Sequence, residues 1–131
     1  MELKEYFEKK SGIGVLSTAD KEGMVDAAIY SKPYVIDDST VVFIMADRLT
    51  RKNLNSSPGA AFLFIEAGNG FTGKRLLMKM AKEGTGEGES DRELLEWYQT
   101  TKKVYPRETL YLAYFDVQRV LPLVSELEQT G

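Results

Sequence analysis

The chain has 131 residues, of which 43% are hydrophobic and 28% charged, a balance typical of one globular domain spanning residues 1–131. Seventeen basic against twenty acidic residues give a net charge of −3, so no overall positive field attracts nucleic acid or an anionic membrane. Cysteine and histidine are both absent, which excludes disulfides, thiolate nucleophiles, Ser-His-Asp triads, histidine ligation of haem and the usual zinc sites. Carboxylates are not clustered as in a calcium loop, so we expect no metal. Any chemistry would then come from a cofactor.

The N-terminal sequence "MELKEYFEKK" is charged throughout, unlike the apolar core of a signal peptide. No apolar run approaches the length that crosses a membrane. We therefore expect a cytoplasmic protein that does not associate with membranes.

Hydrophobic patterning along the chain predicts two or three helices and six strands. Apolar residues at positions 3, 6 and 7 indicate a short amphipathic helix at the N-terminus. The predicted strands are 13–19, 24–36, 40–46, 59–66, 71–83 and 109–123, separated by turn sequences such as "DKEG", "DDST" and "AGNG". Pro33 interrupts the second strand, which predicts a bend or an edge position there. Short strands at this spacing favour a mostly β, antiparallel barrel with helical additions rather than a parallel sheet.

A later helix is predicted over residues 90–103. Ser90 and Glu93 fit a capping box, and Leu94, Leu95 and Tyr98 form one helical stripe. Trp97 and Tyr98 could stack on a bound ring, but we favour core residues, because large aromatic side chains usually serve burial. The preceding "GTGEG" does not match the G-x-G-x-x-G spacing, and its glutamates would repel a pyrophosphate, so we interpret it as a flexible turn.

The segment 46–59, "ADRLTRKNLNSSPG", concentrates cations between two apolar strands. Thr50 is a good N-cap residue and Pro58 marks a stop, so residues 50–56 are predicted to form one or two helical turns. A helix N-terminus favours a phosphate, and Arg48 can add a charged contact. The same residue types also occur in exposed turns, so local chemistry leaves a phosphate site and a solvated turn equally open.

Four motifs that follow one another along the chain favour the phosphate site, because together they resemble a known family. The sequence contains "AAIYS", "LTRKNL", "LFIE" and "GNGFTGKRL", and over residues 13–83 it resembles the flavin-mononucleotide (FMN)-binding split barrels of the pyridoxamine 5′-phosphate oxidase-like group. The resemblance implies a six-stranded antiparallel split β-barrel with short flanking helices, and a homodimer with FMN at its interface.

The resemblance also implies roles for particular residues. The isoalloxazine and ribityl side of FMN would be lined by Ile29, Tyr30 and Ser31, and the backbone of Met45, Ala46 and Asp47 would pass along the cofactor. The phosphate would be held by Arg48, Thr50 and Asn53, with Arg51 and Lys52 pointing to solvent. Further candidates near the same pocket are Lys32, Lys74 and Arg75, whose charges suit a reduced anionic flavin.

Departures from the family's pattern limit what carries over. Oxidases of pyridoxamine phosphate have an S-R-K phosphate motif and a C-terminal R-L-x-P motif. In this chain "TRK" is out of register, and "RVLP" ends the last predicted strand instead of the chain. Vitamin B6 oxidation is therefore not expected, and the catalytic residues are unknown. The alternatives left open are a flavin-dependent oxidoreductase, a non-catalytic electron-transfer or flavin-storage protein, and a barrel that holds another cofactor such as a deazaflavin.

Overall fold

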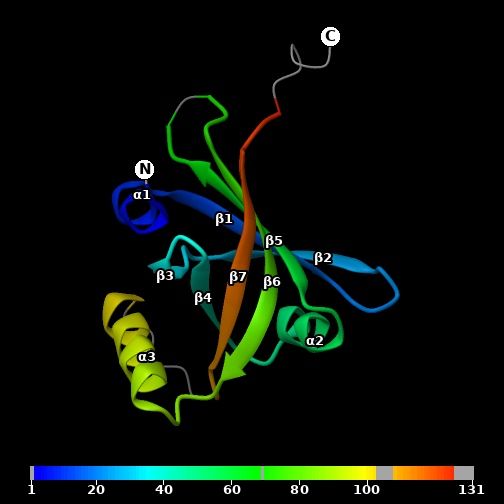
Figure 1. Ribbon diagram of the computed structural model, residues 1–131, viewed down its shortest axis with the longest axis vertical. Helices are drawn as coiled ribbons and strands as arrows, with labels where there is room; N and C mark the ends of the chain where they lie inside the picture. Colours follow the sequence, from blue (N-terminus) through cyan, green and yellow to red (C-terminus); the bar gives the residue numbers. More distant parts are fainter. Residues whose placement is uncertain (1, 69, 103–107, 126–131) are drawn as a thin grey trace.

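The structure is a computed structural model that describes residues 2–68, 70–102 and 108–125. Its elements follow the chain in the order α1 (Leu3–Lys9), β1 (Gly12–Ala19), β2 (Val25–Tyr30), β3 (Tyr34–Asp37), β4 (Thr40–Met45), α2 (Leu49–Ser56), β5 (Gly59–Glu66), β6 (Gly73–Gly84), α3 (Glu89–Lys102) and β7 (Tyr111–Pro122). Figure 1 shows β5, β6 and β7 crossing the middle of the molecule, with α3 and α2 on opposite sides of them.

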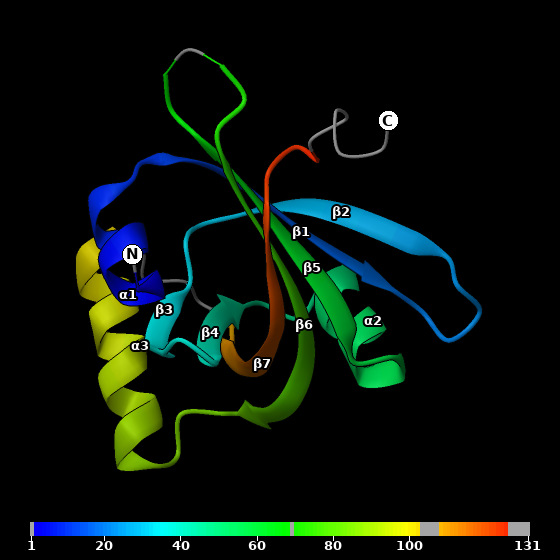
Figure 2. The same cartoon turned by 45° about the horizontal axis from the view of Figure 1, so that its top comes forward.

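The strands form one antiparallel sheet in the order β2-β1-β5-β6-β7-β4-β3. The sheet twists strongly, as Figure 2 shows, which confirms the mostly β, antiparallel split barrel. Alternate residues of β1, β5 and β6 are buried, as expected for strands with one face on a core. The largest fully buried side chains include Phe43, Phe62, Phe64 and Phe115, so an aromatic cluster fills the interior.

The sheet has seven strands, whereas six were predicted. The predicted strand 24–36 is divided at Ser31–Pro33 into β2 and β3, which lie at the two opposite edges of the sheet. Proline cannot donate a ladder hydrogen bond, and the residue before it is restricted, so the chain leaves one edge and crosses to the other at this point.

Gly14 of β1 permits a close approach inside this core. A Cβ atom at this position would overlap the ring of Phe62 and lie 2.7 Å from the backbone oxygen of Tyr30. Glycine is therefore required at this position because a larger side chain would clash with its neighbours, and not because of an unusual backbone angle. Gly14 also pairs with Tyr30 across the strands, so the close approach fixes the end of β2 against the core.

Two predicted helix starts are wrong by one or two residues. In α2 the Arg48 carbonyl accepts the bond from the Lys52 N–H at 3.1 Å, so Arg48 is the N-cap and Thr50 lies inside the first turn. In α3 the Gly88 carbonyl accepts the bond from Arg92 in the same way, which places Ser90 inside the helix. Residue 103, the predicted end of this helix, lies outside the described residues.

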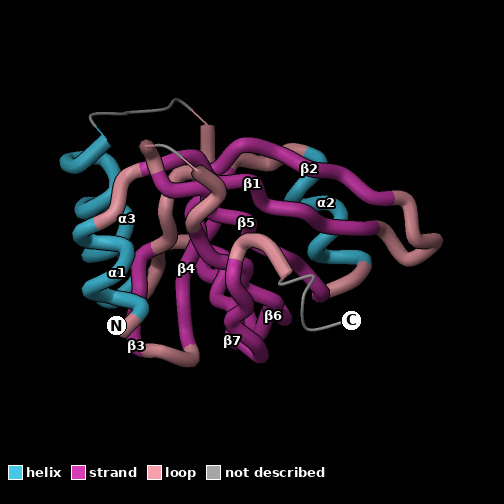
Figure 3. Tube along the Cα trace, turned by 90° about the horizontal axis from the view of Figure 1, so that it is seen from above, coloured by secondary structure: helices cyan, strands magenta, loops and turns pink. Residues whose placement is uncertain are grey.

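The three helices lie at two sides of the sheet. Figure 3 shows α1 and α3 side by side near β3, while α2 lies on the opposite side near β1 and β2. Helix α1 buries Leu3, Tyr6 and Phe7 in the main core. Helix α3 joins a second, smaller cluster through Leu94, as its predicted apolar stripe implies.

Candidate functional site

A cleft of about 380 Å³ opens where the end of β2, the end of β4 and the start of α2 meet, with α3 forming a further wall. Eight residues predicted to bind the cofactor line it: Ile29, Tyr30, Ser31, Lys32, Met45, Ala46, Arg48 and Thr50. The two edge regions of the sheet, β2 and β3–β4, reach this cleft from opposite ends of the strand order. The topology thus brings together residues that are about twenty positions apart in the sequence.

Tyr30 lies between the core and the cleft. Its ring packs edge to face on Phe43, with centroids 6.2 Å apart. Burial raises the pKa of the Tyr30 hydroxyl above its ordinary value, and the neighbouring Thr50 side chain acts in the opposite direction. The phenol is therefore protonated at neutral pH and can act in the cleft as a hydrogen-bond donor.

Thr50 is buried, with 3% of its surface exposed, although its helix begins at the surface. The first turn of α2 also presents the backbone N–H groups of residues 49–51, which have no acceptor within the helix. Partial positive charge collects at such a helix end. The start of α2 therefore offers an anion both a hydroxyl and several N–H donors.

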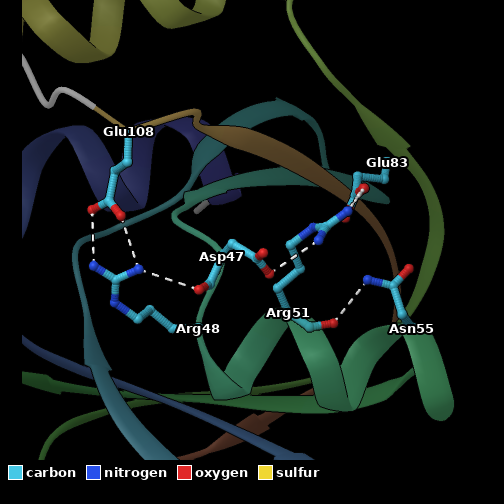
Figure 4. A network of polar contacts seen from close by, with 6 residues as sticks. All are labelled: Asp47, Arg48, Arg51, Asn55, Glu83 and Glu108. Carbon is cyan, nitrogen blue, oxygen red and sulfur yellow. Dashed lines mark hydrogen bonds and ion pairs between the residues drawn. The ribbon is translucent and has the colours of Figure 1, made fainter.

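Arg48 is the cation at this helix start and is exposed to solvent. Its guanidinium forms an ion pair with Glu108 at 2.8 Å and donates a 3.2 Å hydrogen bond to the Asp47 carbonyl (Figure 4). Both side chains of the ion pair remain well solvated. Exposed ion pairs of this kind contribute only about 0–1 kcal/mol of stability, so another anion can replace Glu108 as the partner of Arg48.

Arg51 does not point to solvent as predicted. It donates two hydrogen bonds to the carboxylate of Glu83, at 2.8 and 3.0 Å, and another to Asp47 at 3.0 Å (Figure 4). Its guanidinium also lies 3.6 Å from the ring centroid of Tyr111. The Glu83 contact raises the pKa of Arg51 further above its ordinary value. This cation therefore fixes α2 to β6 and β7, whereas Lys52 is exposed as predicted.

Lys32 lines the cleft, but its ammonium group is already engaged. It donates hydrogen bonds to the backbone oxygens of Phe7 and Lys10, at 2.7 and 2.8 Å, and so ties the β2–β3 connection to α1. Burial, and secondarily the charge of Lys102, lowers its pKa. The Lys32 charge consequently lies toward the α1 side of the cleft.

Four predicted residues do not line this cleft. Asn53 is buried and donates a 3.1 Å hydrogen bond to Thr18 of β1, while the carboxylate of Asp47 accepts from Arg51. On β6, Lys74 lies over the Tyr6 ring at 4.8 Å, and Arg75 donates to the Pro122 carbonyl at 2.8 Å. Asn53 thus fixes α2 to the sheet, and the cofactor roles of all four stay predictions.

Two aromatic residues that the sequence pattern favours as core form a wall of the cleft. Trp97 and Tyr98 of α3 line it together with Tyr34 and Ile44, and Trp97 packs edge to face on Tyr34 with centroids 5.1 Å apart. Adjacent helical residues cannot both face one core, because they point about 100° apart. The adjacency of Trp97 and Tyr98 in the sequence therefore indicates that one of the two rings lies outside the buried stripe of the helix.

Among the residues that the structure describes, no group of three or more carboxylates could hold a metal ion. Within the same residues, no helix is long and apolar enough to cross a membrane.

The chain is similar in sequence and fold to known proteins. The family model described as pyridoxamine 5′-phosphate oxidase matches residues 2–125. An FMN-binding protein from Syntrophomonas wolfei superposes with a TM-score of 0.79 at 20% identity, covering 95% of this chain and 85% of that one. None of the curated proteins matches the chain in sequence.

Two further structures share the fold but carry other names. HupZ from Group A Streptococcus has a TM-score of 0.74 at 18% identity, covering 94% of this chain and 92% of that one. HutZ, a haem storage protein from Vibrio cholerae, has a TM-score of 0.69 at 11% identity, covering 92% of each chain. At these identities the likeness shows the fold alone. The family match spans nearly the whole sequence, and the chain belongs to the pyridoxamine 5′-phosphate oxidase family.

Proposed function

We propose that the protein binds FMN in the cleft between β2, β4 and the start of α2, and acts as a flavin-dependent oxidoreductase. The observation that carries the proposal is the gathering of eight predicted cofactor residues around one cleft. Family membership and the likeness in fold to an FMN-binding protein support the choice of ligand. Bound FMN would supply the capacity to accept and donate electrons, and the chain would bind and orient it.

The start of α2 suits the phosphate of FMN. Backbone N–H groups, the Thr50 hydroxyl and the Arg48 guanidinium lie at one end of the cleft, where the helix dipole also favours negative charge. Glu108 holds Arg48 through a solvated ion pair, so a phosphate can replace it at small cost.

The rest of the cleft suits a flat ring. Tyr30, Ile44, Trp97 and Tyr98 present aromatic and apolar surface. Val25 and Ile29 lie on the same face of β2 and are 74% and 73% exposed. Apolar side chains of this size are seldom left in water together, so we infer that a second copy of the chain covers the cofactor, as in a homodimer.

One observation favours the second candidate, an electron-transfer or flavin-storage protein. The described residues that line the cleft include no carboxylate, and Tyr30 is held in its protonated form. The Lys32 ammonium group is held by two backbone oxygens, so no free general base is found among these lining residues. Turnover with a reduced nicotinamide nucleotide and an electron acceptor separates the two candidates, because only an oxidoreductase with its own substrate shows saturable turnover.

The deciding experiment is the visible spectrum of the purified protein, before and after incubation with FMN. We expect a bound flavin spectrum, and a protein that stays colourless overturns the proposal. Titration with a deazaflavin in parallel identifies a barrel that prefers that cofactor. Thr50→Ala should reduce the preference for FMN over riboflavin, because riboflavin lacks the phosphate. An unchanged preference contradicts the phosphate site.

A further inference from the structure

A second cavity, of about 240 Å³, adjoins the cleft on the side of α1. It lies between α1, the β2–β3 connection and the last turn of α3, the two helices that stand side by side in Figures 2 and 3. Lys32, Tyr34 and Trp97 line both spaces, so the cavity and the cleft adjoin each other. We call it the lysine cavity.

The lysine cavity is electropositive in a protein of net charge −3. Lys4, Lys32 and Lys102 reach it from three separate elements, and Glu8 is the one carboxylate among the described lining residues. Burial, and secondarily the charge of Lys102, lowers the pKa of Lys32, which agrees with the presence of both lysines in the lining of one cavity. Lys32 uses two of its three donors on backbone oxygens, so one donor is left.

Part of the wall of the lysine cavity is aromatic and apolar. Trp97 and Tyr34 meet edge to face, and Phe7, Pro33 and Val35 are the other apolar lining residues. Drug-sized ligands occupy pockets of about 300–1,000 Å³, so this cavity suits a smaller molecule. Its chemistry combines positive charge at one side with aromatic surface at the other.

We propose that the lysine cavity binds a small planar organic anion, of the class of aromatic carboxylates, beside the cofactor cleft. The carboxylate would lie between Lys102 and Lys4, and the ring would contact Trp97. Binding would reduce the repulsion among the three lysines, because Glu8 is the one carboxylate that offsets it among the described lining residues. This binding site does not rest on the proposed function.

Trp97 supplies a direct measurement, because it is the one tryptophan in the whole sequence. We would titrate the purified protein with benzoate and with benzamide, its uncharged analogue of the same shape, and follow tryptophan fluorescence. We expect a saturable change with benzoate and binding at least about tenfold weaker with benzamide, the factor of one charge-assisted contact. Equal affinities, or no saturable change with either probe, overturn the proposal.

Matched variants locate the site. Lys102→Gln should weaken benzoate binding about tenfold and leave FMN binding unchanged, because Lys102 lines the lysine cavity but not the cleft. Arg48→Gln should show the opposite pattern, because Arg48 lines only the cleft. Lys21→Gln, which changes an exposed lysine in the β1–β2 turn, should affect neither. Benzoate binding that follows Arg48 instead of Lys102 would place the anion in the cofactor cleft and refute the proposal.

Flavin fluorescence measures FMN binding separately, so the two proposals fail in distinguishable ways. Benzoate binding that responds to Lys102→Gln in a protein that does not bind FMN would overturn the proposed function and leave the anion site standing. FMN binding without benzoate binding would overturn only the anion site. Circular dichroism of each variant confirms that the fold is kept.

Discussion

Replacing Arg51 by methionine tests the interpretation that this cation is structural. The change keeps an unbranched side chain of similar length but removes the guanidinium that contacts Glu83, Asp47 and the Tyr111 ring. The carboxylate of Glu83, whose side chain is only 19% exposed, then loses its partner. We expect the free energy of unfolding to fall, because a half-buried charge is left without compensation.

The solvent exposure of the Arg51–Glu83 pair determines how much stability its loss costs. Exposed ion pairs contribute about 0–1 kcal/mol, whereas breaking a buried pair costs about 3–5 kcal/mol. Side-chain exposures of 23% for Arg51 and 19% for Glu83 place this pair between these limits, at about 2 kcal/mol. The contact with Tyr111 adds about 0.5–1 kcal/mol. A total of about 2–3 kcal/mol lowers the melting temperature of a chain of this size by roughly 6–12 °C.

Urea unfolding followed by circular dichroism provides the assay, with Lys52→Met as the matched control on the next residue. Lys52 is exposed and forms no ion pair among the described residues, so its replacement should change stability by less than about 0.5 kcal/mol. A double-mutant cycle with Glu83→Gln should give a coupling energy of about 1 kcal/mol or more. If Arg51→Met destabilises no more than Lys52→Met, the structural interpretation is refuted.

Three further changes test other contacts. Gly14→Ala should cost about 1–3 kcal/mol of unfolding free energy, measured in urea, because its Cβ overlaps the Phe62 ring. The Tyr114 hydroxyl donates to Asp91, and burial raises its pKa above the ordinary 10.0, so stability should be lost as pH rises through about 10. Tyr114→Phe should reduce this loss in unfolding experiments at about pH 8 and 11. Glu108→Gln should strengthen FMN binding about two- to fivefold in a fluorescence titration, with riboflavin unchanged.

Strands were predictable where a local pattern decided them. β5 has the predicted bounds, because "GAAFLFIE" is an apolar run between turn residues, and β1 and β4 differ from prediction by one residue at an end. The division of residues 24–36 into two strands at opposite edges of the sheet was not predictable from the hydrophobic pattern. Pro33 indicated an interruption, but the placement of β2 and β3 at opposite edges depends on pairing with β1 and β4, which no local sequence encodes.

The candidate site was also predictable in part. The resemblance carried by the four motifs predicted cofactor-binding residues in and beside β2, β4 and α2. The fold brings eight of these residues to one cleft. The wall from α3 was missed because Trp97 and Tyr98 look like core residues of an amphipathic helix. The partners of Arg51 were also missed, because Glu83 lies 32 residues away on another strand.

The contacts of the three cations in segment 46–59 change what that segment can offer a phosphate. Arg51 is neutralised by two carboxylates, and Lys52 lies on the exposed face of α2. Arg48 is then the one charged side chain from this segment that lines the cleft, and it already shares its charge with Glu108. A phosphate bound here would therefore depend mainly on neutral donors, the N–H groups of α2 and the Thr50 hydroxyl. The rigid placement of those donors by Arg51 and Asn53 matters more to such a site than the number of cations in the sequence.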